Sequence, residues 1–248
     1  MQMCYRYSVP NREILEKKFK ATFKRNEVFE RKYHVDAFNS PNLPVITNES
    51  PQQIDLFHWG LIPFWVKDLK AANEIRQKTA NARSESIFEK PSFRNSAEKK
   101  HCLVLADGFF EWKFFNGKNY PYYIFLKKHK PFAMAGLWED WTNRETQEKI
   151  NTFTIITTKA NPMMENIHNK KKRMPVILRP EDYDKWISMP IDKQSSLELL
   201  IPYDQDDMEA YTISRLITSK KENPNSPDVI KPFRYKELES IDEQKSLF

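Results

Sequence analysis

Glycine is scarce in this chain of 248 residues. Four glycines occur, at positions 60, 108, 117 and 136, where average usage would give about 17. Each remaining glycine therefore marks a place where the backbone geometry requires one. Gly60 and Gly108 stand directly beside the two most aromatic segments of the chain, where a missing side chain allows close backbone approach. We interpret this as a sign that the two aromatic segments form a binding site with a defined shape.

Cysteine is scarcer still, and long hydrophobic runs are missing. The two cysteines, Cys4 and Cys102, are too few for a disulfide framework. No apolar run approaches the roughly 18 residues of a membrane span, and residues 1–8 lack the basic-then-apolar order of a signal peptide. We therefore expect a cytoplasmic protein with both cysteines as thiols and no membrane partner.

Basic residues outnumber acidic ones, which favours a polyanionic partner. Forty Lys and Arg against 34 Asp and Glu give a formal charge of +6, and binding a polyanion would release its counterions. The lysine runs at 170–172 and 220–221 are equally consistent with a solvated surface. A hydrophobic content of 40% excludes a disordered polymer. We expect one globular domain over residues 1–230 and a flexible tail over 231–248.

Strands and helices are predicted in no regular alternation. Residues 108–115 and 120–126 form the clearest pattern, two aromatic strands joined by a loop with Asn116-Gly117, which predicts a hairpin. Further strands are predicted at 43–47, 54–58, 102–105, 132–137, 152–157, 174–178 and 211–217. Helices are predicted at 11–24 with Asn11 as cap, 66–77, from Ser84 with Ser84 as cap, from Asn161-Pro162 to His168, at 181–187 and at 193–199. The order predicts an α+β fold with a mainly antiparallel, partly closed, barrel-like sheet and flanking helices.

Four residues could carry chemistry, although each has a plain structural interpretation. Cys4 could be a small buried hydrophobe, and Glu111 could face solvent from a strand. His168 could cap a helix, and Asn81 could stabilise a turn. None of these residues identifies a function by itself.

Taken together and in this order, the segments around these residues resemble the SRAP family, the SOS-response-associated peptidases that act as abasic-site cross-linking proteins. The resemblance spans residues 4 to about 178. The segments that carry it are Cys4-Tyr5-Arg6; Trp59-Gly60-Leu61-Ile62-Pro63 with Trp65; Asn81-Ala82-Arg83-Ser84-Glu85; Gly108-Phe109-Phe110-Glu111-Trp112; Thr157-Thr158 with Asn161 and His168; and Arg173-Met174-Pro175.

The resemblance implies a SRAP-type fold and an enzyme that processes abasic sites in single-stranded DNA during the DNA damage (SOS) response, at the bacterial nucleoid when engaged. The α-amine of an N-terminal Cys4 would form a Schiff base with the ring-opened sugar, and its thiolate would close a thiazolidine. An α-amine with a pKa of about 7.7–8.0 and a thiol near about 8.5 are both partly nucleophilic at neutral pH. The same imine would permit β-elimination, a lyase activity.

The resemblance also assigns roles to the remaining motif residues. Glu111 would shuttle protons, with its pKa raised by the surrounding aromatic rings. His168 would help to open the sugar ring or steady the developing hydroxyl, and Asn81 would hydrogen-bond the sugar or the amine. The DNA-binding residues would be Arg6, Arg83 and Arg173 on phosphates and Trp65 and Trp112 on bases.

The chain departs from the family's pattern in three places. Residues 1–3 precede Cys4, whereas the family's cysteine follows the initiator methionine, so we expect translation from Met3 or self-trimming by the chain. Four residues, 169–172, separate His168 from Arg173, where the family often has one, and this insertion would shift His168. Tyr5 replaces the usual glycine and places one more aromatic ring beside the nucleophile.

Two other functions remain open from the sequence, and a zinc site is the least favoured alternative. An autoproteolytic cysteine peptidase, a hydrolase, would use Cys4 and His168, but no oxyanion hole or orienting residue is marked. A non-catalytic single-stranded nucleic-acid binding module would not need Cys4. A zinc site would need ligand spacings that the cysteines and histidines lack. We therefore predict no metal and no cofactor, and we expect a monomer.

Overall fold

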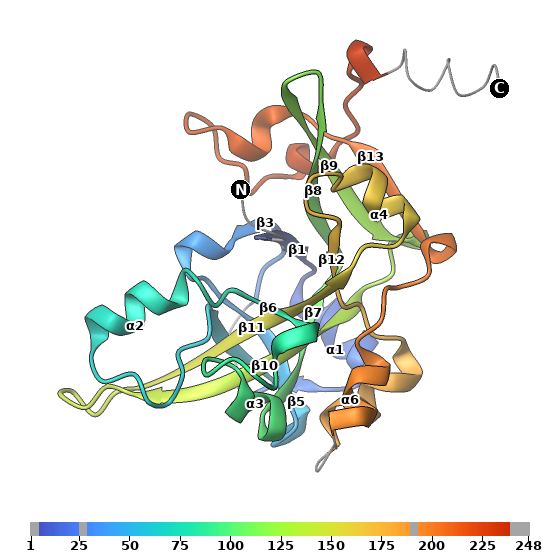
Figure 1. Cartoon of the computed structure of the whole chain (residues 1–248). Coiled ribbons are helices and arrows are strands. Elements are labelled where there is room, and N and C mark those ends of the chain that lie inside the picture. Colours follow the sequence, from blue (N-terminus) through green and yellow to red (C-terminus); the bar gives the residue numbers. More distant parts are fainter. Residues whose placement is uncertain (1–4, 25–28, 189–192, 239–248) are drawn as a thin grey trace.

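The computed structural model describes residues 5–24, 29–188 and 193–238 and contains two sheets (Figure 1). The larger sheet has the order β12-β11-β10-β7-β4-β5-β2, and β6 pairs with β11. Its strands are β2 (Thr22–Phe23), β4 (Asn42–Thr47), β5 (Ser50–Trp59), β6 (Asn81–Arg83), β7 (His101–Ala106), β10 (Phe132–Thr142), β11 (Lys149–Lys159) and β12 (Arg173–Pro175).

Five strands of this sheet close into a barrel. β11, β10, β7, β4 and β5 pair antiparallel in that order, and the end of β5 then pairs parallel with β11. The closing register joins His58 to Thr152 and Trp59 to Phe153. Trp59 and Phe153 are fully buried, and their rings stack in the core. The predicted α+β fold with a barrel-like sheet is confirmed.

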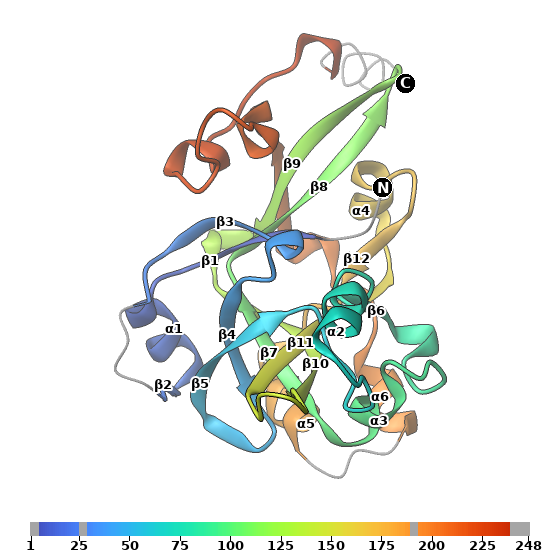
Figure 2. The same ribbon diagram turned by 90° about the vertical axis from the view of Figure 1, so that its left-hand side faces the viewer.

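The smaller sheet, ordered β13-β9-β8-β1-β3, stands on the barrel and carries the chain start. Its strands are β1 (Arg6–Val9), β3 (Lys32–Asp36), β8 (Gly108–Phe115), β9 (Lys118–Leu126) and β13 (Met208–Thr212). Figure 2 shows the β8–β9 hairpin extending away from the barrel, with the C-terminal segment on one side and α4 on the other.

The predicted hairpin is confirmed in its turn and its register. Phe115 pairs with Lys118, and Asn116 and Gly117 between them both have positive φ, 45° and 77°. These values match the turn type for which Asn-Gly is favoured. At the base of the hairpin, a Cβ on Gly108 would lie 2.3 Å from the ring of Tyr123. Gly108 therefore allows Tyr123 to cross the strand at close range.

The described residues form six α-helices around the sheets: α1 (Arg12–Phe19), α2 (Leu69–Arg76), α3 (Arg94–Lys99), α4 (Pro162–Ile167), α5 (Tyr183–Ile187) and α6 (Lys193–Leu199). The predicted caps Asn11 and Asn161 are confirmed, since their side chains accept hydrogen bonds from Ile14 and Met164. α1 ends at Phe19, before the predicted residue 24, because Lys20 turns left-handed at φ 53° and the chain enters β2.

Two predictions about local structure are wrong. Ser84 is not a cap, because it is the first residue of a short 3-10 helix whose cap position is Arg83, without a side-chain hydrogen bond. The late strand predicted at 211–217 ends at Thr212. Ile213 donates to the carbonyl of Pro121 on β9, but Pro121 has no N–H to return, and Ser214 then caps a 3-10 helix.

The predicted strand at 174–178 is shorter than expected. β12 covers only Arg173–Pro175, and beyond it the backbone is held by single bonds, with Val176 donating to Ile156 and Leu178 donating to Ala133. The segment is buried without forming a regular ladder. Single backbone contacts hold it against β10 and β11.

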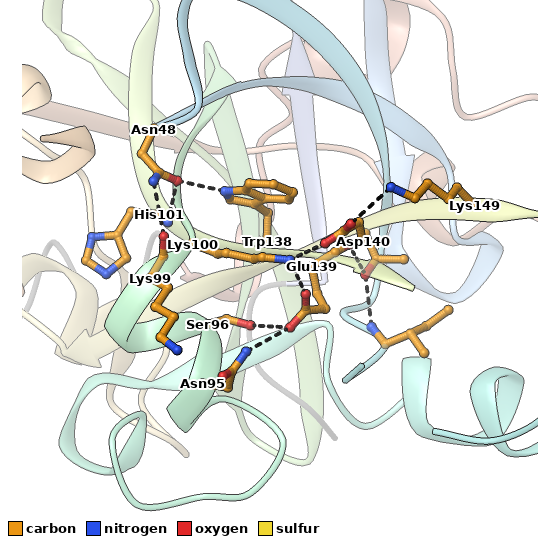
Figure 3. Close-up of polar contacts among 12 residues, drawn as sticks. Asn48, Asn95, Ser96, Lys99, Lys100, His101, Trp138, Glu139, Asp140 and Lys149 are labelled. Atoms are coloured by element: carbon orange, nitrogen blue, oxygen red, sulfur yellow. Dashed lines mark hydrogen bonds and ion pairs between the residues drawn. The ribbon is translucent and has the colours of Figure 1, made fainter. Parts of the chain in front are cut away.

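A polar network fastens α3 to the barrel (Figure 3). The Lys100 ammonium contacts the carboxylates of Glu139 and Asp140 and lies 4.8 Å from the ring centroid of Trp138. Ser96 donates to Glu139 over 3.2 Å. Burial by itself lowers the pKa of Lys100, but its hydrogen bonds to the two carboxylates outweigh this and raise it. The buried Glu139 charge is therefore compensated.

The described part of the C-terminal segment is packed against the hairpin. Phe233 donates its N–H to Thr212 over 2.8 Å, and the Tyr235 hydroxyl donates to the carbonyl of Ile213 over 2.9 Å. The ring of Tyr235 packs edge-on against Tyr120 of β9 at 5.0 Å. The first part of the expected tail over 231–248 is thus in contact with the rest of the fold through Phe233 and Tyr235, and residues 239–248 lie outside the described residues. Within the described residues, no helix is long and apolar enough to cross a membrane.

Candidate functional site

A cavity of about 900 Å³ lies between the hairpin, the loop after α4 and the N-terminal strand. We call it the basic cavity, because its lining contains several cationic side chains. Its lining residues are Tyr5, Arg6, Phe38, Glu111, Trp112, Lys118, Asn119, Pro121, His168, Lys170, Lys171, Arg215 and Thr218. The predicted residues Arg6, Glu111, Trp112 and His168 are brought together here.

The predicted nucleophile Cys4 lies outside the described residues. The next residue, Tyr5, lines the basic cavity. β1 follows at once and lies between β3 and β8, with Tyr7 paired to both Val35 and Phe109. The register of this sheet therefore fixes the start of the described chain beside the strand that carries Glu111.

Glu111 and His168 form a buried pair at the base of the cavity. Their residues are 2% and 6% exposed, and Nε2 of His168 lies 3.6 Å from Oε2 of Glu111. Nδ1 of His168 lies 3.0 Å from the carbonyl oxygen of Arg173. A carbonyl oxygen only accepts, so Nδ1 carries a hydrogen and, in the neutral ring, Nε2 presents its lone pair to Glu111.

The protonation of His168 is set by this environment. Burial lowers the pKa of His168, the hydrogen bond to Arg173 acts in the opposite direction, and nearby Lys171 lowers it further. The net result is a pKa below the ordinary value, so the ring is neutral at neutral pH. A neutral imidazole facing a carboxyl group can receive a proton from it and return it, which is the requirement for acid–base work at a reacting carbonyl.

Arg173 holds His168 in this pair through the hydrogen bond to its backbone carbonyl. Its guanidinium makes a bidentate contact with the Glu85 carboxylate, the second bond being 2.9 Å, and donates to the Thr157 carbonyl over 2.6 Å. Burial raises the pKa of Glu85, but the hydrogen bonds that its carboxylate accepts from Arg173 and from its own backbone, together with the charges of Arg173 and Arg83, outweigh burial and lower the pKa. The guanidinium that the sequence assigned to DNA phosphate is engaged with Glu85 in this structure.

Arg6 also lines the cavity. Its Nε donates to Asp36 over 2.7 Å, and the guanidinium carbon lies 5.1 Å from the ring centroid of Trp112. Stacking on an aromatic face leaves the edge of a guanidinium available to further acceptors. Arg6 and Trp112 therefore form a joined cationic and aromatic surface.

The inserted residues 169–172 do not separate His168 from Glu111. Asn169 binds the backbone of Phe114 on β8 in both directions, accepting from its N–H over 3.1 Å and donating to its carbonyl over 2.8 Å. Lys170 then lies over the ring of Phe114, with Nζ 3.3 Å from the centroid. The insertion is anchored to the hairpin and extends the cationic wall of the cavity.

Asn81, Arg83 and Trp65 are not among the described residues that line the basic cavity. Asn81 and Arg83 lie on β6, which pairs parallel with β11, and Arg83 is exposed. Trp65 is 44% exposed and donates its Nε1 hydrogen to Pro91 over 3.3 Å. Their predicted roles toward DNA remain predictions.

Several lining residues were missed by the sequence reasoning. Phe38 follows β3 in a 3-10 helix (Ala37–Asn39), and Arg215 lies in the 3-10 helix after β13. Neither belongs to a motif. Lys118 follows the Asn-Gly turn, and the predicted hairpin register could have placed it on the strand paired with β8. In the ranges that the structure describes, no group of three or more His, Cys, Asp or Glu side chains could hold a metal ion.

Comparison with known proteins places the chain among a defined set of relatives. The family model described as SOS response associated peptidase (SRAP) matches residues 3–220. The abasic site processing protein YoqW of Bacillus subtilis is 43% identical over 206 residues, covering 81% of this chain and 88% of the relative. The abasic site processing protein YMR114C of Saccharomyces cerevisiae is 32% identical and covers 76% and 50%.

Solved structures of other proteins share the fold. A crystal structure of a protein from Bacteroides thetaiotaomicron is 38% identical, with a TM-score of 0.88 over 93% of this chain and 100% of that one. A crystal structure from Bordetella bronchiseptica is 28% identical, with a TM-score of 0.74 over 85% and 100%. On the sequence match over residues 3–220 and this shared fold, the chain belongs to the SOS response associated peptidase (SRAP) family.

Proposed function

We propose that the chain is an enzyme that processes abasic sites in single-stranded DNA by joining the lesion covalently to Cys4. Relatives at 43% and 32% identity carry the name abasic site processing protein. The observation that carries the proposal is the basic cavity, where a buried carboxyl–imidazole pair opens into a space lined by cationic and aromatic side chains.

The charge of the cavity matches a nucleic-acid backbone. Arg6, Lys118, Lys170, Lys171 and Arg215 line it, with Glu111 as the acidic lining residue at its base. Phosphates would bind these cations with release of counterions, and the ring of Trp112 offers a face to a base. The lesion's sugar would then lie toward the interior, next to Glu111 and His168.

The proposed chemistry joins three groups and expels one water. The α-amine of Cys4 adds to the aldehyde carbon of the ring-opened sugar, giving a carbinolamine. Glu111 donates a proton to the hydroxyl, which leaves as water, and the nitrogen then gives its remaining proton to the Glu111 carboxylate, so that a neutral imine remains. The thiolate adds to the imine carbon, the nitrogen takes up a proton, and a thiazolidine closes. His168 uses Nε2 to exchange with Glu111 the proton that Glu111 donates to the leaving hydroxyl.

This reaction requires a free α-amine at Cys4, so residues 1–3 must be absent from the active form. Protein beginning at Met3, with that methionine removed, supplies the amine. Protein retaining residues 1–3 keeps the thiol but loses the amine, so imine formation through Cys4 is blocked. The two forms differ by residues 1–3, which turn the α-amine of Cys4 into an amide nitrogen.

The test is a denaturing gel of the Met3-start protein with single-stranded DNA containing one abasic site. We expect a shifted, heat-stable band that is absent for Cys4→Ala, for intact DNA and for protein retaining residues 1–3. Glu111→Gln should slow the band's appearance by roughly 100-fold or more. Glu165→Gln, at an exposed carboxylate on α4, is the matched control and should react normally.

The absence of any band would overturn the cross-linking mechanism. Mass spectrometry of the N-terminus would then separate the two remaining functions. Loss of residues 1–3 in wild type but not in Cys4→Ala would indicate a self-processing peptidase. Retained DNA binding without either reaction would indicate a single-stranded DNA-binding module.

A further inference from the structure

The last part of the described chain spans the smaller sheet from one edge strand to the other. Asn225 accepts a hydrogen bond from the backbone N–H of Tyr33 on the edge strand β3 over 2.8 Å. At the opposite edge, Phe233 donates its N–H to the carbonyl of Thr212 on β13 over 2.8 Å and accepts from its hydroxyl over 2.6 Å. We call residues 225–238 the C-terminal strap. It lies beyond residue 220, where the family match ends.

The last turn of the strap is anchored beside the basic cavity. The ring of Tyr235 packs edge-on against Tyr120 at 5.0 Å, and its hydroxyl donates to the carbonyl of Ile213 over 2.9 Å. The Leu238 N–H donates to the Tyr235 carbonyl over 3.0 Å, and Leu238 is 9% exposed. Glu237 lies within this turn, so anchored residues stand on both sides of it.

Glu237 acts on two cations of the cavity wall. Its Oε1 lies 3.4 Å from Nζ of Lys118, the first residue of β9, and Lys118 lines the basic cavity. The pKa of Glu237 is below its ordinary value, because its own backbone and Lys118 donate hydrogen bonds to it and the charges of Lys118 and Arg215 act in the same direction. Arg215 also lines the cavity. One carboxylate therefore offsets part of the charge of both cations.

A second cavity cation, Arg6, has a counter-ion of a different kind. Asp36 is part of β3, its side chain is 13% exposed, and its other oxygen accepts the Phe38 N–H over 3.0 Å. The ion pair between Glu237 and Lys118 has side chains that are 48% and 57% exposed. Exposed ion pairs are weak, so a phosphate can replace Glu237 while the sheet stays intact.

We propose that Lys118 and Arg215 form a phosphate-binding site that Glu237 covers in the free protein, and that a bound DNA strand displaces this carboxylate. The inference rests on the proposed function and adds regulation to it, because the chain's own carboxylate competes with a phosphodiester for two cations. Both anions carry one negative charge and accept hydrogen bonds from Lys and Arg. Glu237 is not among the described residues that line the cavity, so the competition raises the DNA concentration needed for binding without changing the chemistry.

The competition is tested with a single-stranded oligonucleotide that contains a tetrahydrofuran abasic analogue, which has no aldehyde and cannot cross-link. In fluorescence anisotropy, Glu237→Gln should bind it about two- to fivefold more tightly, the range expected for an exposed ion pair. Glu222→Gln is the matched control, because it removes the same charge from an exposed residue outside the described lining of the cavity. It should change affinity less than about 1.5-fold. Equal gains for the two variants would assign the effect to net charge and overturn the proposal.

A second background tests whether the gain passes through the two cations. In a variant that carries Lys118→Gln and Arg215→Gln, Glu237 has neither cation to cover, so adding Glu237→Gln should change affinity less than about 1.5-fold. A gain that persists undiminished in this background would refute the competition. Thermal melts check that the variants fold. If the double variant does not fold, Lys118→Gln alone replaces it, and the gain should then fall by at least half.

Cross-linking of true abasic DNA by Met3-start protein separates this proposal from the proposed function. Glu237→Gln should reach half-maximal rate at about two- to fivefold lower DNA concentration, with the maximal rate of wild type. Cross-linking together with equal analogue affinities for wild type and Glu237→Gln keeps the reaction and rejects the role of the strap. A gain that depends on Lys118 and Arg215, without cross-linking, supports the strap and rejects the covalent reaction. Absence of analogue binding by every variant rejects both.

Discussion

Replacing Glu85 with glutamine tests whether Arg173 acts by positioning His168. Glu85 binds the guanidinium of Arg173 in bidentate fashion, and the carbonyl of the same arginine fixes the His168 tautomer. A glutamine keeps the shape but removes the charge and one acceptor. Hydrogen bonds to charged groups contribute about 1.5–3 kcal/mol. Because the Glu85 side chain is 45% exposed, solvent screening reduces this to about 1–2 kcal/mol.

The first assay is a thermal melt. In a domain of about 150–250 residues, 1 kcal/mol shifts Tm by roughly 2–4 °C, so Glu85→Gln should lower it by about 2–8 °C. The second assay is the pH dependence of the cross-linking rate. Burial keeps the pKa of His168 below its ordinary value. If the loosened Arg173 admits water, this pKa rises toward about 6.5, and the acidic limb of the rate profile moves to higher pH.

A merely structural role for Glu85 would lower Tm and leave the pH profile unchanged, and that result would refute positioning through Arg173. We expect the rate at neutral pH to fall about tenfold, a part of the 10²–10⁴-fold that acid–base groups contribute. The salt dependence of single-stranded DNA binding gives a further check. If Arg173 contacts phosphate, Arg173→Gln reduces the slope by about 0.7; if it only supports His168, the slope stays constant.

Three further predictions concern stability. Glu139→Ala leaves the Lys100 ammonium partly buried with one carboxylate fewer. Urea unfolding should therefore show a free energy of unfolding that is lower by about 3–5 kcal/mol. A decrease under about 1 kcal/mol would contradict the network's role in stability. Gly108→Ala forces Tyr123 to move and should lower Tm by more than Gly117→Ala, which meets no neighbouring atom but keeps an unfavourable φ of 77°. Burial, followed by the charge of Arg6, lowers the pKa of His34 to about 4. Between pH 6.5 and 4 the unfolded state therefore binds the additional proton, and stability falls by about 2–3 kcal/mol as the pH drops. His34→Gln should flatten that part of the pH–stability curve, and an unchanged curve would contradict the shift.

The sequence predicted best those parts of the fold that depend on neighbours along the chain. The Asn116-Gly117 turn and the caps Asn11 and Asn161 were confirmed, because each is determined within a few residues. The closure of the barrel at Trp59 and Phe153 was not specified by any local pattern. A short parallel contact between distant segments has no signature in either segment alone.

The same difference between local features and contacts of distant segments applies to the site. Motif positions identified Glu111 and His168, and the structure brings their side chains within 3.6 Å of each other. The link between Glu85 and Arg173 joins two motifs that are 88 residues apart, and no spacing rule predicts it. Phe38 was missed because a single exposed phenylalanine in a short turn looks like an ordinary surface residue until its stacking on Tyr5 is known.

The placement of β1 within the smaller sheet also has a consequence during synthesis. Arg6 to Val9 are made before β3 and β8, with which they pair, and long before His168, which lines the same cavity as Arg6. At about 5–20 residues per second, translation from β1 to Arg173 takes on the order of ten to thirty seconds. A nascent chain therefore contains β1 long before it contains the other residues that line the basic cavity. Any activity that depends on this cavity is delayed until translation has passed Arg215 and Thr218, which also line it.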